Sequence, residues 1–135
     1  MVQFKSYDDI GVSTEGHVAT IEIQRPPHNF FDYSLIQQIA DAMETIDKDN
    51  NLRCVVLCAQ GNSFCAGANF GSDGSSANRS QENNATDKSS HLYVEAVRLF
   101  ATKTPIVGAI QGAAIGGGLG LSLVPDFRVA CPESR

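Results

Sequence analysis

The chain has 135 residues, of which 42% are hydrophobic and 19% charged, a composition typical of a globular protein of about one domain. Its formal charge is -5, and no cluster of lysine or arginine offsets that charge, which argues against a nucleic-acid or anionic-membrane surface. The chain begins without an apolar signal segment, and no stretch approaches the ~18 to 20 apolar residues of a membrane span. We therefore expect a soluble cytoplasmic protein whose partners include neither nucleic acid nor membrane.

The first half of the chain predicts a β-α-β unit. Residues 17–24 alternate apolar and polar side chains as a strand does, and a Pro-Pro pair then ends the pattern. Asp32 is a candidate N-cap for a helix, and apolar residues recur after it at helical spacing. These are Leu35, Ile36, Ile39, Met43 and Ile46. Residues 52–58 are short, apolar and β-branched, as in a strand buried on both faces, so the sheet is expected to be parallel.

The second half begins with a polar stretch. Residues 71–90 contain almost nothing apolar, which favours a mobile loop that acts as a lid or binding segment, with a plain disordered insertion as the alternative. Residues 91–101 return to helical spacing. A strand at 105–110, a helix at 119–124 and a last strand at 127–131 follow. The order strand, glycine turn, helix, strand therefore occurs twice.

The four cysteines do not form paired C-x-x-C units, and the three histidines are scattered, so no metal site is expected. Cys54, Cys58 and Cys131 fall in strand patterns and are interpreted as small core residues with inert thiols. Cys65, beside a glycine turn, is the one thiol kept as a reactive candidate.

Two glycine turns carry the chemistry. Residues 64–69 follow the strand at 52–58, and residues 112–120 join the next strand to a helix. Glycine lets a ligand approach bare backbone N–H groups, and those at a helix start stabilise negative charge. Two such turns could supply two donors to one anion.

Familiar glycine motifs are excluded by counting. No G-x-G-x-x-G spacing is present, Gly118 stands where a phosphate-binding loop needs lysine, and Ser122 lacks the flanking glycines of a nucleophile elbow. The remaining interpretation is an oxyanion site, in which each N–H donor contributes roughly 3 to 4 kcal/mol.

Several segments, in this order and spacing, resemble the N-terminal half of the crotonase superfamily, the enoyl-CoA hydratase/isomerase family. They are residues 25–29 (RPPHN), 64–69 (FCAGAN), 105–112, 116–118 (GGG) and 125–130 (PDFRVA). The resemblance implies an α/β fold, the crotonase-like (ClpP/crotonase) spiral of β-β-α repeats with perpendicular sheets. Residues 1–135 would form its N-terminal portion, with the C-terminal half absent, and the longer parent would assemble as a homotrimer or a hexamer.

The resemblance also implies a binding site for an acyl-CoA thioester. The backbone N–H groups of Ala68 and Gly117 would grip the thioester carbonyl, and coenzyme A would be part of the substrate, with no separate cofactor. Arg25 would reach a phosphate of the nucleotide or, alternatively, be a solvated charge at a strand end. The binding residues implied are Arg25, Asn29, Ala66, Gly67, Ala68, Asn69, Phe70, Gly116 and Gly117.

The chain departs from the family pattern at the acid/base positions. Gly120 occupies the place where hydratases carry a glutamate, and the second family carboxylate would lie beyond Arg135, because Glu133 comes too early and is expected on a surface loop. Some relatives have a catalytic histidine on the helix after the lid, but His91 is expected to face solvent.

These departures favour double-bond isomerisation over hydration for a longer parent. Thioester hydrolysis, decarboxylation and dehalogenation remain alternatives, as does a non-catalytic module that binds coenzyme A or serves in assembly. We expect no turnover from the 135-residue chain alone, because N–H donors without a general acid/base leave the proton transfers unassisted. Whether the chain is a fragment, a truncated reading frame or a genuine half-length variant stays open.

Overall fold

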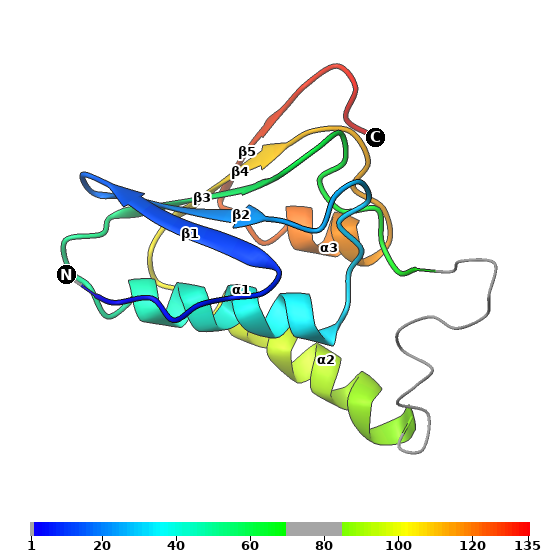
Figure 1. The fold of residues 1–135 in the computed structure, drawn as a ribbon, viewed down its shortest axis with the longest axis horizontal. Coiled ribbons are helices and arrows are strands. Elements are labelled where there is room, and N and C mark those ends of the chain that lie inside the picture. Colours follow the sequence, from blue (N-terminus) through cyan, green and yellow to red (C-terminus); the bar gives the residue numbers. More distant parts are fainter. Residues whose placement is uncertain (1, 70–84) are drawn as a thin grey trace.

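The protein is described by a computed structural model for residues 2–69 and 85–135, without the side chains of residues 85–91. Strands and helices alternate after an initial pair of strands (Figure 1). In chain order the elements are β1 (Ile10–Glu15), β2 (Val18–Ile23), α1 (Tyr33–Ile46), β3 (Cys54–Ala59), α2 (Ala85–Phe100), β4 (Ile106–Ile110), α3 (Gly117–Ser122) and β5 (Phe127–Ala130).

The five strands form one sheet in the order β1-β2-β3-β4-β5. β1 and β2 pair antiparallel, while β2, β3, β4 and β5 are all parallel, with Val18 opposite Cys54 and Val55 opposite Ile106. The predicted parallel β-α-β unit is therefore confirmed. Figure 1 shows α1 below the sheet with α2 alongside it. Because parallel neighbours end at the same edge, the turns that follow β3 and β4 emerge close together.

The core lies between α1 and the sheet. Asp32 caps α1 as predicted, with its side chain accepting from the Leu35 N–H at 2.9 Å. The apolar residues predicted to share one helix face are all buried against alternate residues of β2 and β3, including Ile21, Ile23 and Leu57. Apolar surface removed from water contributes about 25 cal/mol per Å², so burial of these side chains stabilises the packing of α1 on the sheet.

The prediction that the strand at 52–58 is buried on both faces is wrong. In β3, Val55 and Leu57 are fully buried, whereas Cys54, Val56 and Cys58 are only half-buried. α1 covers one face of the sheet, and the alternating side chains of the strand point to the other. Cys54 and Cys58 are therefore free thiols of the uncovered face, not the core residues that were expected, and Cys131 is half-buried too.

Several element boundaries differ from those predicted. β1 was not predicted at all, and α2 begins at Ala85, so residues 85–90 of the expected loop are helical, while 71–84 lie outside the described residues. α3 begins and ends two residues earlier than predicted, because its glycines are part of the helix. Of the perpendicular second sheet, the described residues hold one isolated bridge, between Cys65 and Ala114. No helix in the described part of the chain is long and apolar enough to cross a membrane.

Candidate functional site at the two glycine turns

The two glycine turns meet as the sequence predicted. Cys65 and Ala114 form a parallel bridge between them. The Cys65 N–H donates to the Ala113 carbonyl at 3.0 Å, and the Cys65 carbonyl accepts from Ile115 N–H, also at 3.0 Å. Backbone hydrogen bonds thus fix the first turn directly to the second.

The contact between the turns leaves no room for side chains at two positions. Gly67 has φ +84°, and a Cβ there would lie 2.7 Å from the Ile115 carbonyl oxygen. A Cβ on Gly118 would lie 1.9 Å from the Cys65 carbonyl oxygen. Real Cβ atoms do not approach backbone oxygens so closely, so glycine is required for this approach.

Ala68 and Gly117, one from each turn, line the same pocket, whose volume is about 390 Å³. Neither backbone N–H donates a hydrogen bond to any residue that the structure describes. Gly117 is the first residue of α3, where N–H groups have no partner within the helix. Both residues therefore border one pocket, and each has a backbone N–H without an acceptor among the described residues. Backbone N–H groups are donors of the kind that stabilise an oxygen as it becomes negative.

The rest of the pocket is apolar. Phe31 forms its floor under Gly117, because a Cβ on Gly117 would lie 2.7 Å from the Phe31 ring. Gly120 also lines the pocket, and a Cβ there would meet nothing within 4 Å. Among the described lining residues the only ionisable side chain is that of Tyr93. The remaining lining residues are Leu92, Ala96, Leu99, Phe100, Leu121 and Val124.

Arg25 is held by acidic neighbours. Its guanidinium contacts Asp32 at 2.8 Å and Asp9 at 3.2 Å, and it donates to the Phe30 carbonyl at 2.9 Å. Burial alone would lower the pKa of Arg25, but the Asp32 and Asp9 carboxylates outweigh it and raise that pKa. These contacts make Arg25 a link between β2 and the start of α1 and show that it is not a freely solvated charge, while its contact with a phosphate stays a prediction.

Asn29 has no exposed surface at all. Its amide group donates to the Gln60 and Ser63 carbonyls, both at 2.8 Å, and its oxygen accepts from the Arg25 N–H at 2.9 Å. The predicted contact between Asn29 and coenzyme A is therefore corrected, because every polar atom of this side chain is already bonded inside the protein.

The other candidate residues have mixed outcomes. Cys65 is fully buried, and burial raises the pKa of its thiol, so it is not the reactive thiol that was considered. Glu133 is exposed on a turn, as predicted. Ala66, Asn69 and Gly116 belong to the two turns, and their contact with a ligand stays a prediction. Phe70 and the side chain of His91 lie outside the described residues.

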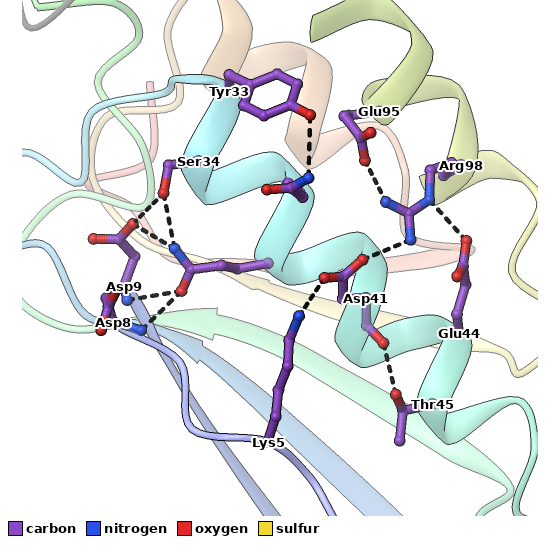
Figure 2. A network of polar contacts seen from close by, with 12 residues as sticks. Lys5, Asp8, Asp9, Tyr33, Ser34, Asp41, Glu44, Thr45, Glu95 and Arg98 are labelled. Atoms are coloured by element: carbon purple, nitrogen blue, oxygen red, sulfur yellow. Dashed lines mark hydrogen bonds and ion pairs between the residues drawn. The ribbon is translucent and has the colours of Figure 1, made fainter. Parts of the chain in front are cut away.

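The part of the site that was not predicted is the attachment of α2, which contributes one wall of the pocket. Arg98 lies between Asp41 and Glu44 of α1, each at 2.7 Å, and it also pairs with Glu95 on its own helix (Figure 2). Lys5 reaches Asp41 at 2.5 Å from the opposite side. The sequence places one arginine on α2 and two acidic residues on α1, and these ion pairs could have been predicted only if the packing of α1 against α2 were already known.

The fold is that of a protein of the crotonase class. A family model described as enoyl-CoA hydratase/isomerase matches residues 13–135. The chain belongs to the enoyl-CoA hydratase/isomerase family and has the fold of the N-terminal part of a crotonase-type protein.

Similar proteins, identified by sequence and by structure, agree with this family assignment. A probable enoyl-CoA hydratase of Mycobacterium tuberculosis is 35% identical over 126 residues, which cover 93% of this chain and 48% of that protein. An enoyl-CoA hydratase subunit I of Geobacillus kaustophilus superposes with a TM-score of 0.83 at 28% identity, over 96% of this chain and 49% of that one. An enoyl-CoA hydratase/carnithine racemase of Magnetospirillum magneticum gives 0.81 at 27% identity, over 96% and 48%. The chain thus spans about half the length of the relatives it matches.

Proposed function

We propose that this chain binds an acyl-CoA thioester, with the thioester oxygen accepting hydrogen bonds from the Ala68 and Gly117 N–H groups. The observation that carries the proposal is that these two unpartnered donors, from turns far apart in the sequence, line one pocket. When a proton leaves the carbon next to the carbonyl, the oxygen becomes an enolate, and donors already in place stabilise it at no cost in reorganisation.

For a longer parent protein we propose proton transfer between carbons, as in double-bond isomerisation, rather than addition of water. Hydration needs an acid/base group to activate water, and Gly120 supplies none at the pocket edge. Isomerisation needs one carboxylate that moves a proton between two carbons of the same enolate. Thioester hydrolysis, decarboxylation and dehalogenation would use the same donors with other residues.

A second candidate is a non-catalytic module that keeps affinity for coenzyme A or serves in assembly. It is favoured by the absence of any carboxyl group among the described residues that line the pocket. The closely packed turns favour the first candidate, since Gly67 and Gly118 preserve a geometry that assembly alone does not need.

Three measurements separate these proposals: calorimetry with acetyl-CoA, an isomerisation assay and a hydration assay. Each is made with the purified chain and with any longer parent. We expect acetyl-CoA to bind to both, the chain alone to give no turnover, and the parent to isomerise 3-hexenoyl-CoA while leaving crotonyl-CoA unhydrated. Absence of acetyl-CoA binding would overturn the acyl-CoA proposal. Hydration of crotonyl-CoA at hydratase-like rates would overturn the preference for isomerisation, and turnover by the 135-residue chain would show that donors alone suffice.

A further inference from the structure

The loop between β2 and α1 contacts both glycine turns. The His28 carbonyl accepts from the Ala66 N–H at 2.9 Å, and the Phe31 N–H donates to the Gly67 carbonyl at 2.8 Å. These two bonds hold the backbone immediately before Ala68. The Phe31 ring packs under Gly117, so the same loop supports the second donor as well.

Asn29 lies between the two residues that make these bonds. It is one of the few non-glycine residue types tolerated in the left-handed region, and its φ is +49°. Its N–H donates to the Arg25 carbonyl at 2.9 Å, which closes a tight turn. The turn reverses the chain so that His28 and Phe31 both face the first glycine turn.

The Asn29 side chain fixes the distance between this loop and the segment that leads into the donor turn. It donates to Gln60 and Ser63, which lie on either side of the bend after β3. Both acceptors are main-chain carbonyls, so the contact locates backbone. A buried amide with every hydrogen bond satisfied rigidifies its surroundings, and losing it leaves polar groups without partners.

We propose that Asn29 is a positioning residue that sets the direction of the Ala68 N–H, acting through the His28 to Ala66 and Phe31 to Gly67 hydrogen bonds. It touches no substrate. The proposal rests on the oxyanion function proposed above. It states that one buried side chain, Asn29, fixes the position of one of the two N–H donors. Without the Asn29 hydrogen bonds, the first glycine turn is free to shift, and the two donors no longer converge on one oxygen.

The test compares two ligands that differ only at the carbonyl: acetyl-CoA and its thioether analogue S-ethyl-CoA. The wild-type chain is expected to prefer acetyl-CoA by about tenfold, the equivalent of two modest hydrogen bonds. Asn29→Gly keeps the positive φ but deletes the side chain, and its preference is expected to fall to about twofold or less. Binding of S-ethyl-CoA itself is expected to change little.

One further measurement and two further variants exclude a merely structural effect. The carbonyl stretch of bound 13C-labelled acetyl-CoA is expected to shift to lower frequency in the wild type and to lose most of that shift in the variant. Asn29→Asp is the second variant, used if Asn29→Gly does not fold, because it keeps the oxygen that accepts from Arg25. Asp32→Asn is the matched control: it weakens the Arg25 ion pair, leaves the Asn29 bonds intact, and is expected to keep the tenfold preference.

The outcomes are distinct. A wild-type chain with no preference for acetyl-CoA overturns the oxyanion function itself. A wild-type preference that persists in the Asn29 variants overturns the positioning role alone. An equal loss of affinity for both ligands shows that Asn29 supports only the fold, and also overturns the proposal.

Discussion

The pocket has two walls that are held by different forces. The donor wall, residues 64–69 and 112–118, is joined by backbone hydrogen bonds and by direct backbone contact. The helix wall, residues 92–100 of α2, is attached to α1 through the ion pairs of Arg98 (Figure 2). Backbone hydrogen bonds have fixed geometry and little salt dependence, whereas partly exposed ion pairs are screened by salt. The wall that needs precise geometry is therefore the one built from backbone.

The largest expected effect comes from a matched pair of substitutions in α3. Gly118→Ala places a Cβ 1.9 Å from the Cys65 carbonyl oxygen, so the donor wall must separate, and we expect a loss of about 3 kcal/mol of unfolding free energy. Gly120→Ala makes the same chemical change where nothing lies within 4 Å, and is expected to raise stability by about 0.5 kcal/mol. Urea denaturation of both variants measures the difference. Equal stabilities would show that the donor wall is not closely packed.

This contrast also shows what could be predicted from the sequence. The helical spacing that begins at Leu35 and the Asp32 cap predict α1, because an amphipathic face and a capping side chain are local features. The convergence of the glycine turns followed from the parallel β-α-β order. Asn29 was not understood, because a polar residue in a loop is normally exposed, and its burial depends on carbonyls more than thirty positions away. β1 was missed because Ser13, Thr14 and Glu15 give it little apolar signal.

The second prediction concerns Asp47, which ends α1 and holds the segment that follows α2. Its carboxylate accepts from the Lys103 and Thr104 N–H groups at 2.9 Å and from the Thr104 hydroxyl at 2.8 Å. We expect Asp47→Ala to lower the unfolding free energy by about 2 kcal/mol, since the exposed Lys103 N–H and the partly buried Thr104 N–H and hydroxyl lose a charged acceptor. Asp47→Asn keeps one acceptor oxygen and is expected to cost about half as much. Because the hydrogen-bond donors are neutral and the charge of Lys103 contributes least to the Asp47 pKa, the loss should depend only weakly on salt, and a strong salt dependence would contradict this.

The smallest effect is expected for Arg98→Met, which keeps the apolar stem of the side chain and removes the charge. It leaves Asp41, Glu44 and Glu95 without their shared partner, and the expected loss is about 1 kcal/mol at low salt. The loss should shrink in 1 M NaCl, unlike that of Asp47→Ala. Glu44→Gln removes the more exposed partner and should cost less. Amide exchange should show the change at α2 and none at the donor wall.

In the wild-type chain, low pH is expected to weaken the attachment of the helix wall and to leave the donor wall unchanged. The hydrogen bond from Arg98 lowers the pKa of Glu44. Burial alone would raise the pKa of Asp41, but hydrogen bonds from Lys5 and Arg98 outweigh burial and lower it. A carboxyl group whose pKa is lower when folded contributes stability above its unfolded pKa, and loses that contribution as the pH falls through the folded value. The ordinary values are 3.8 for Asp41 and 4.5 for Glu44, so the wild-type advantage over Arg98→Met should be complete at pH 6 and decline below about pH 4. An advantage that persists undiminished at pH 2 would mean that the Arg98 guanidinium holds the helix wall by hydrogen bonds that do not need charged carboxylates, and the contrast between the two walls would then be one of geometry and not of charge.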